Sequence, residues 1–311
     1  MTRPLSGGRL IEATGDGCPR LMIEVWSQGH SQNPAYTMPF SFFTSHLTPF
    51  LTSYLTSYLT PSLTPSLTPS FLTMNIEVIL SPLLYDMRTI KQSHTTVAVD
   101  VLRATSAICA AFQAGAEEIV PLDSLEPLRS YADMGYLIAA ERGGCKLAGA
   151  TCGNSPTEYL TMDLKGQRLA YSTTNGTVSI LRASGSDRAL VGAFANISVL
   201  AEAIKDDENL VILCSGWKGE PSLEDTVFAG ALVARLQQIA TDVVLVNDAA
   251  MMSRDLWSMA EGDPLAFCSR ATHVHRLESF GDAAIADIRW AFQLDTCPLL
   301  PVLIEGKLVR F

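Results

Sequence analysis

Short apolar runs alternate with longer segments of helical period from residue 74 to the end of the chain. The apolar runs predict strands at 75–80, 97–101, 118–122, 136–140, 168–172, 189–193, 210–214 and 302–304. The segments between them predict helices at 104–115, 124–134, 177–184, 195–206, 223–239, 246–260 and 278–292. This alternation is typical of an α/β fold, and we predict a layered α/β/α arrangement around a mixed, largely parallel sheet. In such a sheet the ligand site lies at the C-terminal ends of the strands.

Residues 1–73 follow a different pattern. From Leu47 a four-residue repeat begins, and the prolines that recur inside it are incompatible with a continuous helix. The stretch lacks the charged start and unbroken apolar core of a signal peptide, and its leucines are too diluted for a transmembrane helix. We predict a low-complexity, disordered extension. Because the sequence from Met74, MNIEVILSP, reads like an N-terminal strand, we also hypothesise that the true start is Met74 and that 74–311 form the folded domain.

The run VAVDVLRATS at 97–106 is the richest in candidate chemistry. A buried strand there delivers Asp100 and Arg103 to its C-terminal end, directly before a helix of small residues. The start of that helix, with the hydroxyl of Thr105 and free N–H groups, is a ready anion site. An acid and an arginine together at this place indicate a bound cation and a bound oxyanion. A structural Asp–Arg pair in a strand–helix turn is the alternative explanation.

Later turns repeat this combination of acids, cations, hydroxyls and glycines. The candidate residues in them are Glu141, Arg142, Gly143, Gly144, Lys146, Asn154, Ser155, Thr173, Thr174, Asn175, Gly176, Lys218, Glu224 and Asp225. Paired glycines let backbone N–H groups approach an anion, and a hydroxyl-rich turn before a helix does the same. Helix capping explains several of these turns singly, including the two acids in the first turn of the helix at 223–239. The repetition at successive strand ends favours a site.

Composition narrows the chemistry. The formal charge of −10 over 311 residues argues against a nucleic-acid partner. The histidines lack the spacing of a zinc site, and we expect His273 and His275 to be surface or packing residues. Seven cysteines without a CxxC pair indicate reduced thiols and a cytoplasmic protein. Carboxylates, arginines, hydroxyls and glycine turns are the groups that Mg²⁺ and a phosphate require, so we predict Mg²⁺-dependent phosphoryl chemistry.

The motifs DVLRATS, ERGG, GNSP, TTNGT and CSGWKGEPSLEDT, the helix at Asn196 and a closing helix with DI resemble those of the 2-phosphosulfolactate phosphatase family. They occur in the family's order and spacing, between about Met74 and Phe311. The resemblance implies a Mg²⁺-dependent phosphatase that hydrolyses (2R)-2-phospho-3-sulfolactate to 3-sulfolactate and phosphate, a step in coenzyme M biosynthesis and sulfolactate metabolism. Carried over by position, the site residues are Asp100, Arg103, Glu141, Arg142, Asn154, Thr174, Asn175, Glu224 and Asp225.

The roles that follow from the resemblance are hypotheses. We expect Mg²⁺ on Asp100, Glu141 and Asp225, and catalytic roles for Asp100, Arg103, Arg142 and Glu224. Either arginine would neutralise the phosphoryl oxygens, and Asp100 or Glu224 would be the general base. The substrate-binding candidates are Thr105, Gly143, Gly144, Lys146, Asn154, Ser155, Thr173, Thr174, Asn175, Gly176 and Lys218. Two alternative mechanisms use Asp100 as a nucleophile or a cysteinyl-phosphate on Cys145 or Cys214.

The partner expected from this interpretation is a small phosphorylated sulfonate, with no nucleic acid and no membrane, and homo-oligomerisation stays an open alternative. Two rival functions also remain. The same pocket could hydrolyse another small phospho-acid, or it could bind a metabolite as a sensor without turnover.

Overall fold

The computed structural model describes residues 9–10, 24–25, 73–88, 90 and 92–311. The chain divides into two units, residues 1–67 and 68–311. In the first unit, β1 (Arg9–Leu10) pairs antiparallel with β2 (Glu24–Val25). The predicted low-complexity extension otherwise lies outside the described residues. The following paragraphs concern the second unit.

The second unit is built on an eleven-stranded mixed sheet, which confirms the predicted fold class. In chain order the strands are β3 (Met74–Ile79), β4 (Thr95–Val99), β5 (Glu118–Pro121), β6 (Leu137–Arg142), β7 (Cys145–Lys146), β8 (Arg168–Ser172), β9 (Arg188–Gly192), β10 (Asn209–Cys214), β11 (Val243–Leu245), β12 (Pro301–Ile304) and β13 (Lys307–Arg310). Their order across the sheet is β11-β3-β10-β4-β9-β12-β13-β5-β8-β6-β7. All eight predicted strands are present, with borders within two residues of the prediction. The short strands β7, β11 and β13 were not predicted.

The sheet consists of two parallel blocks joined by a hairpin. The first block is β11-β3-β10-β4-β9, and the second is β5-β8-β6. The hairpin β12–β13 pairs antiparallel with β9 on one side and with β5 on the other. The pairing therefore reverses the strand direction from one block to the other. Because residues after β4 and after β8 nevertheless line one cavity, the sheet must twist and bend between the blocks.

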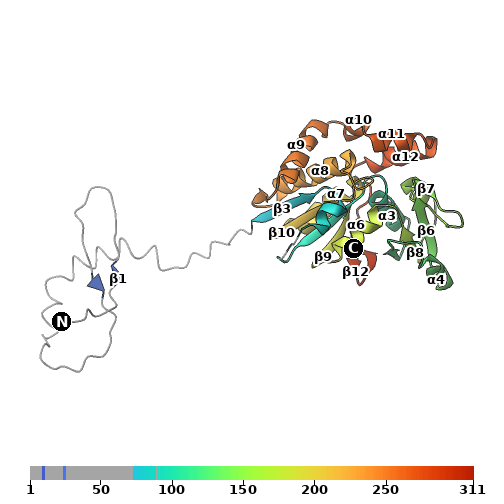
Figure 1. Cartoon of the computed structure of the whole chain (residues 1–311), viewed down its shortest axis with the longest axis horizontal. Coiled ribbons are helices and arrows are strands. Elements are labelled where there is room, and N and C mark those ends of the chain that lie inside the picture. Colours follow the sequence, from blue (N-terminus) through green and yellow to red (C-terminus); the bar gives the residue numbers. More distant parts are fainter. Residues whose placement is uncertain (1–8, 11–23, 26–72, 89, 91) are drawn as a thin grey trace, which may run out of the picture. The chain divides into compact units, whose positions relative to one another are not determined.

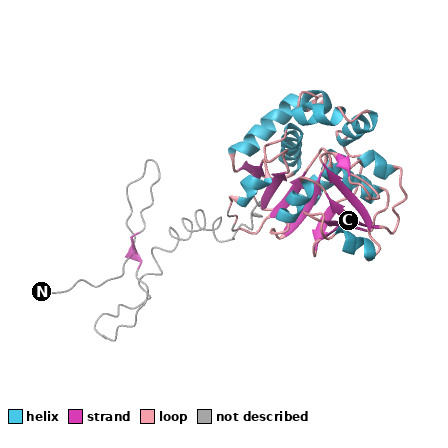
Figure 2. Cartoon of the chain, turned by 45° about the vertical axis from the view of Figure 1, so that its right-hand side comes forward, coloured by secondary structure: helices cyan, strands magenta, loops and turns pink. Residues whose placement is uncertain are grey.

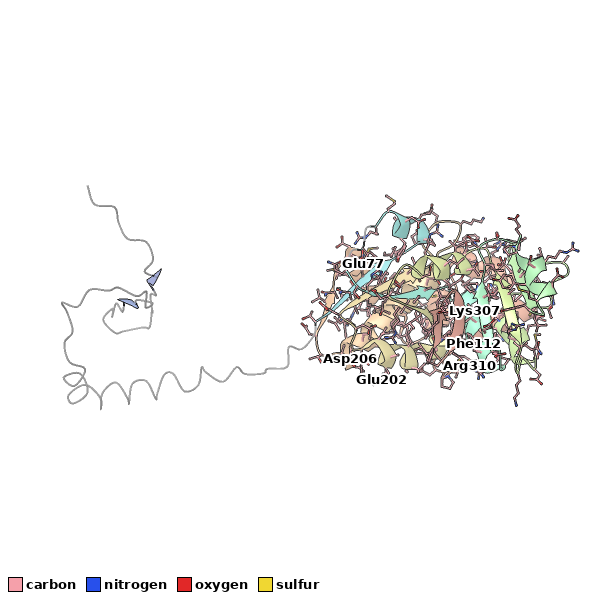
Figure 3. The ribbon with its side chains drawn as sticks, turned by 90° about the horizontal axis from the view of Figure 1, so that it is seen from below. Glu77, Phe112, Glu202, Asp206, Lys307 and Arg310 are labelled. Atoms are coloured by element: carbon pink, nitrogen blue, oxygen red, sulfur yellow. The ribbon has the colours of Figure 1, made fainter. Side chains whose placement is uncertain are left out.

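Contacts of β13 hold the hairpin at this junction. Lys307 Nζ pairs with Glu118 on β5 at 3.0 Å, and Arg310 donates to the Phe112 carbonyl at 3.0 Å (Figure 3). Phe112 belongs to α3 (Ala104–Gln113), whose residues 104–112 are all buried. One apolar cluster joins α3 to Ala98 of β4 and to Leu169 of β8. This helix therefore packs against both sheet blocks, which explains why its sequence has no polar face.

Helices cover both faces of the first block, which gives the α/β/α layers (Figures 1 and 2). Alternate residues of β10 pack against α7 (Ile197–Ile204), α8 (Leu223–Ile239) and α9 (Asp248–Ala260) on one face. The intervening residues of β10 face the side of α2 (Pro82–Asp86). On this second face Ala98 packs with α3 and with α6 (Gly176–Ala183).

The remaining helices are α4 (Leu128–Asp133), α5 (Pro156–Leu160), α10 (Pro264–Cys268), α11 (Thr272–Glu278) and α12 (Asp282–Ala291). The predicted helix at 278–292 is corrected to α12, and the separate helix α11 precedes it. Gly281, with φ 94°, lies between the two helices in a backbone conformation that favours glycine. In Figure 1 the helices α8 to α12 form a group along one side of the sheet.

Candidate active site

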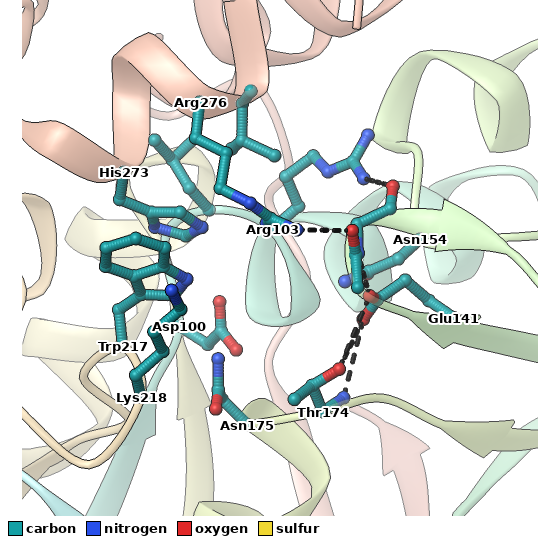
Figure 4. Close-up of a pocket in the computed structure, with 14 residues that line it drawn as sticks. Asp100, Arg103, Glu141, Asn154, Thr174, Asn175, Trp217, Lys218, His273 and Arg276 are labelled. Atoms are coloured by element: carbon teal, nitrogen blue, oxygen red, sulfur yellow. Dashed lines mark hydrogen bonds between the residues drawn. The ribbon is translucent and has the colours of Figure 1, made fainter. Parts of the chain in front are cut away.

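A cavity of about 130 Å³ lies where the C-terminal ends of β4, β6, β8 and β10 meet α11 (Figure 4). Its lining combines acids and amides with three cationic side chains and an aromatic one. The lining residues are Asp100, Leu102, Arg103, Glu141, Gly143, Gly144, Asn154, Thr174, Asn175, Trp217, Lys218, His273, Arg276 and Leu277. The cavity thus brings together residues that are up to 177 positions apart in the sequence.

Asp100 follows β4 and is held by the start of α3. Its Oδ1 accepts a hydrogen bond from the Ala104 N–H at 3.2 Å. Gly176 packs directly against the carboxylate, and a Cβ at that position would lie 2.7 Å from Asp100 Oδ2. Burial raises the pKa of Asp100 to about 6; the Ala104 N–H and the charge of His273 lower it, and the charges of Glu141 and Glu224 raise it.

Glu141 ends β6 on the other side of the cavity. Its carboxylate accepts hydrogen bonds from the Gly144 N–H and from the N–H and hydroxyl of Thr174, the latter two at 3.4 Å. Gly143 and Gly144, with φ 65° and 88°, form the tight turn into β7. The two backbone conformations favour glycine, so this turn brings an N–H group back onto the preceding carboxylate.

Arg103 is a buried arginine that is fixed on two sides. Its Nη1 donates to Asp287 Oδ2 of α12 at 2.7 Å, and its Nη2 donates to the Gly144 carbonyl at 2.7 Å. Asp287 Oδ1 in turn accepts from the hydroxyls of Ser155 and Thr157 at 2.7 and 2.6 Å. Both partners of the ion pair are buried, so the guanidinium is held in one orientation beside the cavity.

Arg276 and Lys218 are the other cations of the cavity wall. Arg276 Nη2 donates to the Gly143 carbonyl at 2.7 Å. Arg276 and Arg103 therefore both donate hydrogen bonds to carbonyls of the β6–β7 turn. Lys218 lies in a turn after β10 with φ 55°, and its Nζ is 4.5 Å from the centroid of the Trp217 ring. Figure 4 shows both side chains directed toward the drawn pocket.

Glu224 and Asp225 are buried in the first turn of α8 and do not line the cavity. Asp225 accepts from the N–H groups of Val101 and Gly216 at 2.8 and 3.0 Å, and burial, followed by the charges of Asp100 and Glu224, raises its pKa well above the usual range. Glu224 Oε1 is 2.6 Å from His273 Nδ1, while its buried Oε2 has no hydrogen-bond partner among the described residues. Asp225 therefore organises the backbone around Asp100, and Glu224 acts on His273.

Nine of the candidates from the sequence line the cavity: Asp100, Arg103, Glu141, Gly143, Gly144, Asn154, Thr174, Asn175 and Lys218. Gly176 packs behind Asp100, and Thr105 binds the backbone of Asp100. Thr173 binds Thr177 at the start of α6, and Ser155 caps α5 through the Glu158 N–H. Lys146 pairs with Glu158 at 3.0 Å outside the cavity.

Arg142, which we expected to be catalytic, is directed away from the cavity. Its guanidinium donates to the carbonyl and hydroxyl oxygens of Ser172, at 3.2 and 2.9 Å, and it does not line the cavity. The reason is the alternation of side chains along a strand. Because Glu141 points into the cavity from β6, its neighbour Arg142 points to the opposite side.

Five residues of the cavity wall were not candidates from the sequence: the apolar Leu102 and Leu277, and the polar or aromatic Trp217, His273 and Arg276. We expected surface or packing roles for His273 and His275. His275 is exposed, but His273 is buried, stacks on Trp217 with a centroid separation of 5.1 Å and lines the cavity. The signal that could have identified the pair is the three-residue spacing of His273 and Arg276, which places them on one face of a helix.

The carboxylates in and around the cavity determine where the expected Mg²⁺ could bind. Among residues 73–88, 90 and 92–311, no three His, Cys, Asp or Glu side chains are grouped to hold a metal ion. Asp225 in particular uses both carboxylate oxygens on backbone N–H groups. Asp100 and Glu141 remain, close enough that the charge of Glu141 raises the pKa of Asp100. This pair fits Mg²⁺ in its common mode, in which one or two carboxylates are joined by waters and substrate phosphate oxygens.

Neither cysteine considered as a nucleophile lines the cavity. Cys214 is buried at the end of β10, and burial raises the pKa of its thiol well above the usual range. Cys145 is exposed on β7.

In the part of the chain that the structure describes, no helix is long and apolar enough to span a membrane.

Comparisons with known proteins agree on one family. A family model described as 2-phosphosulpholactate phosphatase matches residues 81–306. A probable 2-phosphosulfolactate phosphatase of Parasynechococcus marenigrum is 38% identical over 211 residues, which are 66% of this chain and 87% of that protein. Proteins of the same description from Thermosynechococcus vestitus and Thermotoga maritima are 36% and 32% identical over 70% of this chain and 92% of each relative.

Proposed function

The chain belongs to the 2-phosphosulfolactate phosphatase family, and on this basis we propose that it is a Mg²⁺-dependent phosphatase that hydrolyses (2R)-2-phospho-3-sulfolactate to 3-sulfolactate and phosphate. The observation that carries the proposal is the charge pattern of the cavity. Two carboxylates that suit a hard cation, Asp100 and Glu141, lie in one cavity with three cations, Arg103, Lys218 and Arg276. The proposed substrate carries a phosphate, a carboxylate and a sulfonate, so it needs several cations for recognition.

In this proposal Asp100 and Glu141 would hold Mg²⁺, which when bound supplies positive charge to the phosphoryl oxygens and a more acidic water. Arg103 donates to the phosphoryl oxygens, because its ion pair with Asp287 fixes its orientation. Asp100 accepts a proton from the attacking water. Lys218 and Arg276, on the side of Trp217, bind the carboxylate and sulfonate of the substrate.

The biological setting belongs to the same proposal. We infer a role in sulfolactate metabolism or coenzyme M biosynthesis, in the cytoplasm, with a small phosphorylated sulfonate as the partner. Hydrolysis of another phospho-acid and ligand binding without turnover are the rival outcomes of the test.

Phosphate release by the full chain tests the proposal. We expect turnover of 2-phospho-3-sulfolactate that stops when EDTA removes Mg²⁺ and resumes when Mg²⁺ is returned. 2-Phospholactate, which lacks the sulfonate, should be a poorer substrate. The variant Glu141→Gln should lose more than the roughly 10- to 100-fold that removal of a hydrogen-bond partner of a metal ligand typically costs, because a metal-binding carboxylate is itself removed. Glu117→Gln, at an exposed glutamate, should behave like the wild type. Turnover in EDTA would contradict the metal role, and turnover of 2-phospholactate alone would contradict the substrate.

A further inference from the structure

His273 is held in the cavity wall by two contacts on different sides of its ring. Its Nδ1 lies 2.6 Å from Glu224 Oε1, and its ring stacks on Trp217 with an interplanar angle of 16°. An ionised carboxylate can only accept a hydrogen bond, so Nδ1 must be the donor in this pair. This leaves Nε2, for which no described residue provides a hydrogen-bond partner, as the ring nitrogen that is free for a ligand.

A buried carboxylate on one nitrogen of an imidazole fixes the orientation of the ring and stabilises the imidazolium. Glu224 is such a carboxylate, because it is only 1% exposed and contacts the Nδ1 of His273. The contact joins α8, which carries Glu224, to α11, which carries His273. A histidine that only filled space would not need this partner. The Glu224–His273 pair is therefore an arrangement suited to proton transfer at Nε2.

The proposed reaction needs such a group on the side of the leaving oxygen. Cleavage of the ester bond would release the alkoxide of a hydroxy acid, which is a poor leaving group unless it takes up a proton. A ring nitrogen that faces the cavity can supply this proton. In Figure 4, His273 lies beside the drawn pocket, next to Trp217.

We propose that His273 is the general acid of the reaction and that Glu224 is its positioning residue. The inference rests on the proposed phosphatase function and adds a catalytic residue to it. The water oxygen forms a bond to phosphorus and gives its proton to Asp100. The bond from phosphorus to the ester oxygen breaks, its electron pair stays on that oxygen, and the oxygen takes the proton from His273 Nε2. Proton exchange with solvent restores both residues.

A substrate whose leaving group needs no proton tests this assignment. The probe is the analogue of 2-phospho-3-sulfolactate in which sulfur replaces the bridging ester oxygen, because a thiolate leaves without protonation. For His273→Gln we expect kcat to fall by about 10²- to 10⁴-fold with the oxygen ester and to stay within about fivefold of wild type with the sulfur analogue. Glu224→Gln should show the same selectivity with a smaller loss, because the ring remains in place but loses its ionised partner.

The matched control is His275→Gln, which changes an exposed histidine two positions along the same helix and should leave both rates unchanged. Imidazole added to His273→Ala should restore turnover of the oxygen ester, which a purely structural role does not allow. Equal losses with both substrates, or no loss with either, would overturn the assignment. Wild-type protein that hydrolyses neither substrate would instead overturn the proposed function itself, so the two failures are distinguishable.

Discussion

Asp100 illustrates how a single residue can favour function at the expense of stability. Its carboxyl group is buried beside Glu141 and Glu224, and burial is the main reason that its pKa rises from 3.8 to about 6. In the folded protein the carboxyl therefore holds its proton more tightly than in the unfolded chain. The folded state is fully favoured by this group only below about pH 4, and it loses that advantage as the pH rises through about 6.

We therefore predict that Asp100→Asn makes the protein more stable at neutral pH while abolishing phosphate release. A shift of about two pKa units corresponds to about 3 kcal/mol, and the variant should recover a part of it in Mg²⁺-free buffer at pH 7.5. Urea unfolding of the variant and the wild type, in EDTA at pH 7.5 and at pH 4.5, provides the measurement. The stability difference should shrink at pH 4.5, where the wild-type carboxyl is protonated. A variant less stable than wild type at pH 7.5 would show that ionisation of the buried Asp100 carboxyl does not destabilise the folded protein.

At the same scale, Asp100, Arg103 and Glu141 could be predicted as site residues from the sequence, because each follows an apolar run that is typical of a strand. It could not give the direction in which a side chain points, which separates Glu141 in the cavity from Arg142 outside it. Nor could it give the partners of His273. The stack on Trp217 and the hydrogen bond to Glu224 join residues 49 to 56 positions away, and no local pattern records such contacts.

The helix α12 shows how an element far along the chain supports the site. It contributes Asp287, which is 1% exposed and accepts hydrogen bonds from Arg103 and from Ser155 and Thr157 at the start of α5. One carboxylate thus joins α12, α5 and the turn after β4. Removing it would leave the Arg103 charge buried without its counter-charge, which is costly.

We predict that Asp287→Ala destabilises the protein by about 3–5 kcal/mol, the usual cost of breaking a buried ion pair by removing one partner. The kcat should also fall, because Arg103 loses the contact that fixes its orientation. Urea unfolding and phosphate release measure the two effects. Asp282→Ala is the matched control, since this exposed acid at the start of the same helix contributes only through the helix dipole, about 0.3–1 kcal/mol. Equal effects of both variants would show that the pair with Arg103 contributes little.

Element boundaries followed from the sequence where the hydrophobic period was long enough. Strands such as β8 and β10 and the long helix α8 were predicted to within a residue or two. The elements that were missed, including β7, β11 and α11, are two to seven residues long, too short for a period to show. The omission of α11 mattered most, because that helix carries both His273 and Arg276 into the cavity.

At the scale of the whole molecule, the fold brings two parallel blocks of strands to one cavity by means of a C-terminal hairpin. Alternating strands and helices predicted the fold class, but they did not predict that β12 and β13 are inserted between β9 and β5. This insertion reverses the direction of the second block. It depends on pairings between strands more than 100 residues apart, such as Leu308 with Ile119, so local sequence could not specify it.

The first residue of the apolar clusters in the second unit is Met74, and the family match begins at residue 81. We therefore predict that residues 74–311 alone unfold at the temperature of the full chain to within about 4 °C and keep its kcat to within about twofold. The exposed hydrogen bond from the Thr73 hydroxyl to Asp242 is lost in this truncation, but such a bond adds only about 1 kcal/mol.

Thermal unfolding and phosphate release of both forms check this prediction, and a chain that begins at Ser81 is the matched control. That chain lacks β3, which pairs with β10 on one side and β11 on the other and places Ile76 and Val78 in the core. It should fail to fold, because a strand inside the sheet supplies hydrogen bonds to two neighbours and apolar area to the core. If the chain from Met74 also failed, residues before it would have to contribute to the fold, and the hypothesis that the domain starts at Met74 would be wrong.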